Sequence, residues 1–134
     1  MFDVVIIGCG IVGAAAAYEL SRYRLNIAVI EKENDVSNAV SKANSGIIHA
    51  GYDPEPGSLM AKLNVEGAYL ASQICKDLDV PYRRCGSLVV AFDERETEIL
   101  NMLLERGKKN GVPSLEIWDA EKLREQEPNL NKDA

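Results

Sequence analysis

The chain has 134 residues, of which 46% are apolar and 27% are charged, so it has the composition of a folded protein with one compact core. Fifteen basic and 21 acidic residues give a formal net charge of −6, which argues against a nucleic-acid partner because such proteins present a basic stripe. The longest apolar runs, 4–7 and 14–18, are far shorter than the roughly 18 residues that cross a bilayer, so we expect no transmembrane segment.

The cysteine and histidine content bears on location and metal binding. Cys9, Cys75 and Cys85 form no CxxC pair, and three thiols cannot all be bridged. This pattern favours reduced thiols, and we therefore expect a cytoplasmic location. His49 is the only histidine and no cysteine cluster accompanies it, so we expect no bound metal.

The first thirty residues predict a βαβ unit. Residues 3–7 form a β-branched run that indicates a buried strand, residues 11–23 are rich in alanine and predict a helix, and residues 27–30 indicate a second strand. A helix between two strands carries the chain back over the sheet, so the strands should pair in parallel. The predicted fold class is α/β, beginning with a Rossmann-like FAD/NAD(P)-binding βαβ module that is incomplete.

A GxGxxG fingerprint, GCGIVG, follows this strand and opens the predicted helix. In such a fingerprint Gly8 allows the tight turn, Gly10 lets the backbone approach a pyrophosphate, and Gly13 lets the helix pack closely on the sheet. The first N–H groups of the helix then face the phosphates. Glu31 ends the second strand, where its carboxylate would bind the adenosine ribose hydroxyls and repel a 2′-phosphate, which disfavours NADP.

By itself the fingerprint leaves two questions open. It predicts a dinucleotide site without separating NAD from FAD. The structural alternative is a tight strand–helix junction in which the glycines bind nothing and Glu31 is solvated.

The rest of the chain predicts a long loop followed by mainly helical structure. Residues 32–57 are rich in Ser, Asn, Gly and Pro, and a loop of this length inside a compact domain is usually functional. Ser58 then caps a long helix with an apolar stripe. The residues of that stripe are Leu59, Leu63, Leu70, Ile74 and Leu78.

Two further strands and two further helices are expected beyond this stripe. Residues 82–92 and 115–118 are strand-like. Asp93 begins a helix that ends at Gly111, with Pro113 beyond it. Asp119 caps a last helical turn or two before Pro128.

The segment SKANSGIIHAG, Ser41 to Gly51, resembles the signature loop of the D-amino-acid-oxidase-type FAD-dependent oxidoreductases. Within that family the longer string SKANSGIIHAGYDPEPGSL is most similar to the glycerol-3-phosphate dehydrogenase and L-2-hydroxyglutarate oxidase branch. The resemblance extends from Val4 to Pro128 and implies FAD as the cofactor. It also implies that Ser41 and Lys42 contact the ribityl–phosphate side and that residues 44–48 contact the flavin side.

The cofactor-binding residues predicted from the fingerprint and the resemblance form one set. They are Gly8, Gly10, Ile11, Val12, Gly13, Glu31, Lys32, Ser41, Lys42, Asn44, Ser45, Gly46, Ile47 and His49. His49 has three readings: a non-covalent flavin contact, a covalent flavin anchor, or a locally satisfied packing residue. We assign no catalytic residue.

The resemblance implies oxidation of a small anionic hydroxy acid or polyol phosphate, of the glycerol-3-phosphate or L-2-hydroxyglutarate class, by hydride transfer to flavin. An NAD-dependent Rossmann dehydrogenase and a non-catalytic nucleotide-binding subunit are the alternatives. We expect residues 1–80 to be the N-terminal part of an FAD-binding domain and residues 81–134 to be the truncated start of a substrate domain. The expected partner is the rest of an enzyme chain, without which these residues should be inactive and hold FAD weakly.

Overall fold

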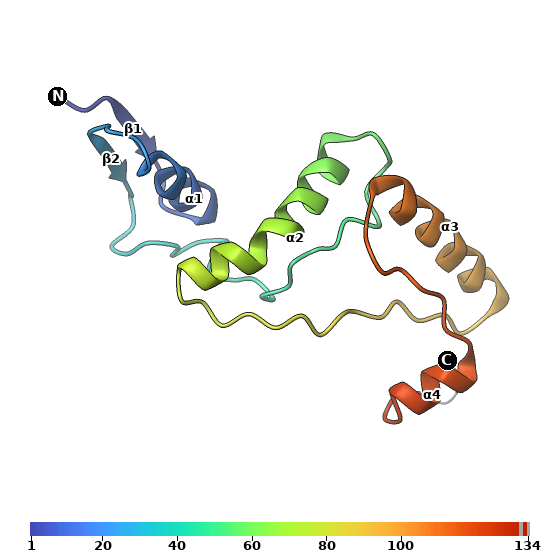
Figure 1. Cartoon of the computed structure of the whole chain (residues 1–134). Helices are drawn as coiled ribbons and strands as arrows, with labels where there is room; N and C mark the ends of the chain where they lie inside the picture. Colours follow the sequence, from blue (N-terminus) through green and yellow to red (C-terminus); the bar gives the residue numbers. More distant parts are fainter. Residues whose placement is uncertain (132, 134) are drawn as a thin grey trace. The chain divides into compact units, whose positions relative to one another are not determined.

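The structure, a computed structural model, describes residues 1–131 and residue 133 (Figure 1). The chain divides into two compact units, Met1–Ile47 and Ile48–Ala134, and each is described by itself. The division at residue 80 concerns the domains of a larger enzyme and stays a prediction. Residues 132 and 134 of the predicted second domain lie outside the described residues.

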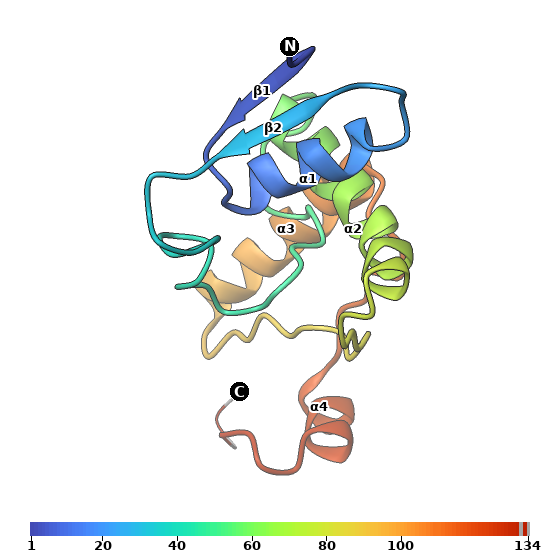
Figure 2. The ribbon, with the colours of Figure 1, turned by 90° about the vertical axis from the view of Figure 1, so that its left-hand side faces the viewer.

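The first unit is the predicted βαβ module. Strand β1 (Val4–Ile7), helix α1 (Ile11–Leu20) and strand β2 (Ile27–Ile30) follow one another along the chain. The two strands pair in parallel from Val4 opposite Ile27 to Ile7 opposite Ile30, and α1 lies against one face of the pair (Figure 2). The predicted α/β fold class with a parallel βαβ start is confirmed.

The ends of these elements show how the register is set and where the helix stops. The Asp3 carboxylate accepts hydrogen bonds from the backbone N–H of Asn26, at 2.8 Å, and from its side-chain amide, at 3.1 Å. This contact joins the starts of the two strands. Helix α1 ends at Leu20, three residues before the predicted end at Tyr23, because the Tyr23 N–H donates to the Leu20 carbonyl and tightens the chain into the turn before β2.

The helices of the second unit begin at the predicted capping residues. Helix α2 (Leu59–Asp77) begins where the Ser58 hydroxyl accepts from the Ala61 N–H at 3.1 Å. Helix α3 (Glu94–Asn110) follows Asp93, whose carboxylate accepts from the Glu96 N–H at 2.8 Å.

The end of α3 and the start of α4 follow the same local rules. Helix α3 ends at Gly111, which adopts a left-handed φ of +83°. Helix α4 (Ala120–Gln126) begins where the Asp119 carboxylate accepts from the Lys122 N–H at 2.9 Å. No helix within the described residues has the length and apolar character needed to cross a membrane.

The two later strands predicted from the sequence are absent. Residues 82–92 and 115–118 have irregular backbone, and in the described part of the chain the only sheet is the pair β1 and β2. A strand is held by hydrogen bonds to a neighbouring strand, and these apolar runs have none in this chain. The prediction of two further strands is therefore wrong for the chain as it stands.

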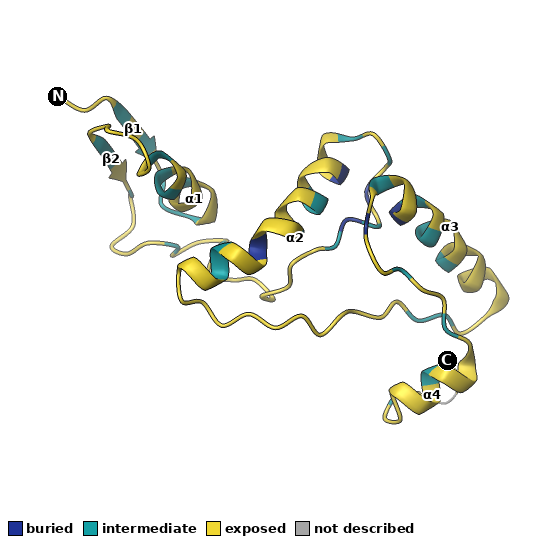
Figure 3. Cartoon of the chain, viewed as in Figure 1, coloured by how far each residue is buried: buried dark blue, intermediate teal, exposed yellow. Residues whose placement is uncertain are grey.

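The expectation of one compact core is also wrong, because the chain divides into two units and few of its apolar side chains are buried. Among the described residues the buried apolar side chains are Ala61, Ala71 and Val112, and every buried residue belongs to the second unit (Figure 3). The leucines of the apolar stripe on α2 are half or more exposed, and Leu59 is 69% exposed. An exposed stripe of this kind is typical of a surface that other protein covers.

The helix glycines provide a test of the packing in the second unit. Gly67 lies in α2 with open space where a Cβ would stand, whereas a Cβ on Gly107 in α3 would clash with Leu115 and approach the Tyr52 Cβ to 2.9 Å. Gly67→Ala should stabilise the chain by about 0.5–1 kcal/mol because alanine loses less entropy in a helix. Gly107→Ala should destabilise it by about 1–3 kcal/mol.

Urea denaturation followed by far-UV circular dichroism measures both free energies of unfolding. Equal effects of the two substitutions would contradict the close packing of Tyr52 and Leu115 on α3.

Candidate functional site

Gly8 and Gly10 lie between the end of β1 and the start of α1, and Gly13 lies in the first turn of α1. The local geometry favours glycine at each position for a different reason. Gly8 adopts a left-handed φ of +94°, which favours glycine. A Cβ on Gly13 would clash with the carbonyl oxygen of Gly8, so only glycine lets α1 lie this close to the strand end. Gly10 has an ordinary φ of −75°, and its hydrogen faces the Ser41 hydroxyl, 3.0 Å from where a Cβ would stand.

The N-terminus of α1 is the positive end of this arrangement. The first N–H groups of a helix have no carbonyl one turn earlier to bond, and the helix dipole favours an anion at this end. The Ile11 N–H donates to the Ser41 hydroxyl oxygen at 2.8 Å, and the Ser37 N–H donates to the Cys9 carbonyl at 2.9 Å. The structure thus places Ser41, a cofactor-binding residue predicted from the loop, in contact with the glycine fingerprint.

Glu31 is the negative counterpart at the end of β2. Its carboxylate accepts from the backbone N–H of Cys9 at 2.7 Å, of Lys32 at 2.9 Å and of Glu33 at 3.1 Å. These hydrogen bonds, that of Cys9 above all, lower the pKa of Glu31 below its ordinary value of 4.5. An ionised carboxylate has about four acceptor positions, so the side chain is held in place and keeps capacity for a hydroxyl donor.

The rest of the predicted loop is folded by local contacts. The Asn44 side chain donates to the Ser41 carbonyl and accepts from the Gly46 N–H at 2.7 Å, with Gly46 at a left-handed φ of +67°. The Lys42 ammonium lies 3.5 Å from the Asn38 amide oxygen. Side chains at the tip, Ser45 and Ile47 among them, are exposed.

Four predicted residues have exposed side chains that make no contact with the fingerprint turn in the contacts described. Ile11 and Val12, in the first turn of α1, are 69% and 81% exposed. The Lys32 ammonium pairs with Glu33 at 3.3 Å. His49 is exposed and belongs to the second unit, so its three readings stay open.

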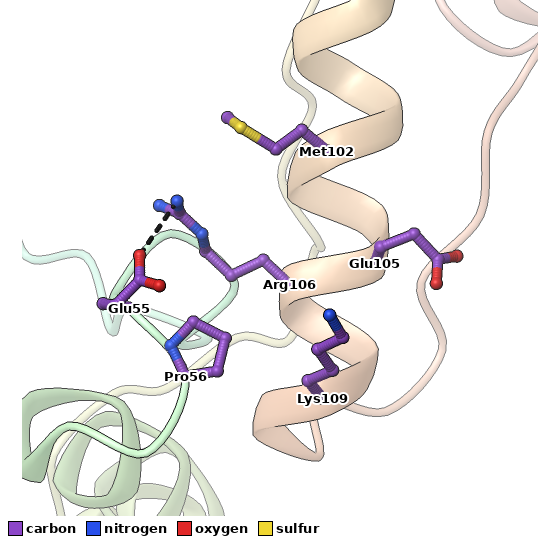
Figure 4. Close-up of a pocket in the computed structure, with 6 residues that line it drawn as sticks. All are labelled: Glu55, Pro56, Met102, Glu105, Arg106 and Lys109. Carbon is purple, nitrogen blue, oxygen red and sulfur yellow. Dashed lines mark ion pairs between the residues drawn. The ribbon is translucent and has the colours of Figure 1, made fainter.

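Two residues of α3 that sequence analysis missed contact the backbone that follows the loop. The Asn110 amide donates to the carbonyls of Gly51 and Pro54, and the Arg106 guanidinium donates to the carbonyl of Asp53. Arg106 also pairs with Glu55 across a pocket of about 210 Å³ that Met102 and Lys109 help to line (Figure 4). No sequence signal connects residues this far apart; Asn110-Gly111 indicates only the end of a helix.

The arrangement in the first unit fits a dinucleotide. A dinucleotide-binding site is built from a parallel βαβ turn with glycine at its helix start, a helix N-terminus that can face a pyrophosphate, and a fixed carboxylate after the second strand. This chain has all three, with Gly10 at the helix start and Glu31 after β2. Among the described residues, no group of three or more His, Cys, Asp or Glu side chains is placed to hold a metal ion. The fold and site therefore define a dinucleotide-binding α/β protein.

The chain belongs to the FAD-dependent oxidoreductase family. The model of the family described as "DAO: FAD dependent oxidoreductase" matches residues 3–134. The resemblance read from the loop is confirmed, and the cofactor is FAD, which decides the choice between NAD and FAD that the fingerprint left open.

Individual relatives carry several names. The chain is 54% identical over 98% of its length to "Glycerol 3-phosphate dehydrogenase" of Caloramator mitchellensis, and 47% identical over 96% to mitochondrial "L-2-hydroxyglutarate dehydrogenase" of Nematostella vectensis. It spans 27% and 28% of those two proteins. Over 98% of its length it matches the structure of FAD-bound, dithionite-reduced L-alpha-glycerophosphate oxidase from Mycoplasma pneumoniae, with a TM-score of 0.85 and 37% identity, and it covers 35% of that chain.

The lowered pKa of Glu31 predicts a pH-dependent contribution to stability. A carboxyl group with a lower pKa in the folded state stabilises the fold above its unfolded pKa, near 4.5, and this contribution is lost as the pH falls through the folded pKa. Glu31→Gln should therefore be less stable than the wild type near neutral pH, and the difference should shrink below about pH 4.5.

Denaturation curves at several pH values measure that difference. Glu98→Gln, on the exposed surface of α3, shows the effect of simply removing one negative charge. A difference for Glu31→Gln that stays constant from neutral pH into acid would show that its three backbone hydrogen bonds do not stabilise the ionised form.

Proposed function

We propose that the whole protein oxidises a small anionic hydroxy compound of the glycerol-3-phosphate or L-2-hydroxyglutarate class. The observation that carries the proposal is the dinucleotide cradle of the first unit, in a chain that matches relatives named for these two substrates over nearly its full length. Both substrates carry a secondary hydroxyl group beside an anionic group. When bound, FAD supplies the acceptor for the hydride from the carbinol carbon.

The roles of this chain in the proposal are binding and orientation. The N-terminus of α1, with Gly10 and the Ser41 hydroxyl, would hold the pyrophosphate, because its N–H groups and dipole favour negative charge. Glu31, already fixed by three backbone N–H groups, would accept hydrogen bonds from the adenosine ribose. The Asn44 turn would shape the loop toward the flavin, and residues 47–49 would lie beside it.

The rest of the proposal concerns what completes the site and where the protein works. The exposed stripe of α2 and the unpaired runs 82–92 and 115–118 support a partner that covers them, and we propose further chain of the enzyme. Residues 1–134 alone should then hold FAD weakly and turn over no substrate. The three free cysteines support a cytoplasmic location.

The decisive experiment measures oxidation by the whole protein as its gene encodes it. Glycerol 3-phosphate and L-2-hydroxyglutarate are each offered with an artificial electron acceptor, and D-2-hydroxyglutarate serves as the stereochemical control. Turnover of one L-substrate with bleaching of the flavin absorbance supports the proposal. Bound FAD that neither substrate reduces would favour the non-catalytic nucleotide-binding alternative.

A substitution at Gly10 tests the cradle. In the whole protein, Gly10→Val should abolish FAD binding, because its Cβ would stand 3.0 Å from the Ser41 hydroxyl and its branched side chain would lie beside the backbone N–H groups. The φ of −75° and ψ of −176° at Gly10 are open to valine, so the effect reports lost space and not backbone strain.

FAD retention after gel filtration, read as the ratio of absorbance at 450 nm to that at 280 nm, measures this loss. Gly67→Val adds the same bulk on the exposed part of α2 and should keep the cofactor. Wild-type FAD affinity in Gly10→Val would contradict the assignment of the pyrophosphate site.

A further inference from the structure

The segment that follows the predicted flavin-side residues is held unusually firmly for a loop. Gly51 and Pro54 are buried although neither belongs to a helix or strand. Gly51 adopts a left-handed φ of +97°, and a Cβ there would lie 2.8 Å from a Val65 methyl group and 3.2 Å from the Asn64 Cβ on α2. One side of this segment therefore packs directly on α2, in a conformation and a space that suit only glycine.

Asn110, the last residue of α3, holds the same segment from another side. Its side-chain amide nitrogen donates to the carbonyl of Gly51 at 2.9 Å and to the carbonyl of Pro54 at 2.8 Å. Carbonyl groups only accept, so these two contacts determine which way the amide points. Its own oxygen is buried without a hydrogen-bond partner in the described part of the chain, so the side chain is oriented wholly by the loop.

Arg106, one turn earlier on α3, contacts the residues between and beyond those carbonyls. Its guanidinium donates to the Asp53 carbonyl at 2.7 Å and pairs with the Glu55 carboxylate at 3.1 Å (Figure 4). The Arg106 side chain is 26% exposed and that of Glu55 is 76% exposed. The Arg106 side chain is thus largely covered by protein, whereas the Glu55 side chain is exposed to solvent.

The position of this segment depends on those side chains. Residues 51–56 have no strand partner, and the carbonyls of residues 51, 53 and 54 are bonded by the two side chains of α3. Gly107, between Arg106 and Asn110, lets Tyr52 pack against the helix backbone. Residues 47–49, which we propose to lie beside the flavin, precede Gly51 by two to four positions. Because so few residues separate them, a shift of residues 51–54 would also move residues 47–49.

We propose that Asn110 and Arg106 are positioning residues that set where the flavin-side end of the loop lies. This inference rests on the proposed function, because it takes residues 47–49 to lie beside the flavin. Neither side chain needs to touch the cofactor: both act through the backbone of residues 51–54. A position error of about 1 Å at a reacting centre can cost on the order of a hundredfold in rate, which makes such anchors functionally important.

The test uses the whole protein with bound FAD and compares matched substitutions on α3. Asn110→Asp keeps the side-chain shape but removes both N–H donors, and Arg106→Gln removes the cation. The controls are Asn101→Asp and Arg95→Gln, at exposed positions of the same helix; the Asn101 amide donates only to the Thr97 carbonyl one turn earlier. Visible-region circular dichroism of the bound flavin, the FAD dissociation constant and the kcat and KM of the preferred substrate are measured for each.

We expect Asn110→Asp and Arg106→Gln to change the visible circular dichroism of the flavin and to lower kcat at least tenfold, while both controls match the wild type. If Asn110→Asp does not fold, Arg106→Gln decides. A lower melting temperature with an unchanged flavin spectrum and unchanged kcat in the holoprotein would show a merely structural role and overturn the inference. A wild-type protein that binds no FAD would instead overturn the proposed function.

Discussion

The close approach of α1 to the end of β1 is the constraint on which the site depends. Because a side chain on Gly13 would strike the Gly8 carbonyl, the helix can start directly beyond the strand only with glycine there. That start points the N-terminal N–H groups of α1 past the carboxyl edge of the sheet, where ligands of open α/β sheets bind. The Ser41 hydroxyl on the Ile11 N–H then ties the long loop to the same point.

Opposite charges lie at neighbouring ends of this small module. The helix dipole makes the start of α1 positive, and the ionised Glu31 stands at the end of β2, its pKa lowered by the Cys9 N–H of the fingerprint turn. An FAD molecule needs this pairing, since its pyrophosphate is anionic and its ribose hydroxyls are donors. The Cys9 N–H to Glu31 hydrogen bond therefore joins the two halves of the recognition site before any ligand is present.

The second unit has helices with local caps but leaves much apolar surface exposed. Its helices have their caps, yet the stripe of α2 is exposed and the runs 82–92 and 115–118 have no strand to pair with. Within this unit, residues 51–54, which follow the cofactor loop, are bound to α3 by hydrogen bonds from the side chains of Asn110 and Arg106. These tertiary hydrogen bonds of the unit therefore lie close in sequence to the proposed flavin-side residues.

The sequence by itself determined whatever depends on near neighbours. The β-branched runs, the alanine-rich helix, the caps at Ser58, Asp93 and Asp119 and the glycine fingerprint act within a few residues of the chain, so their patterns predicted β1, β2 and all four helices. Only the tertiary structure decided the rest. A strand forms only when it pairs with another strand, which can be distant in the sequence. Residues 82–92 have a strand-like pattern but no strand to pair with among the described residues, so their backbone is irregular. The hold of Asn110 on Gly51 and Pro54 depends on how α3 packs, which no local pattern encodes.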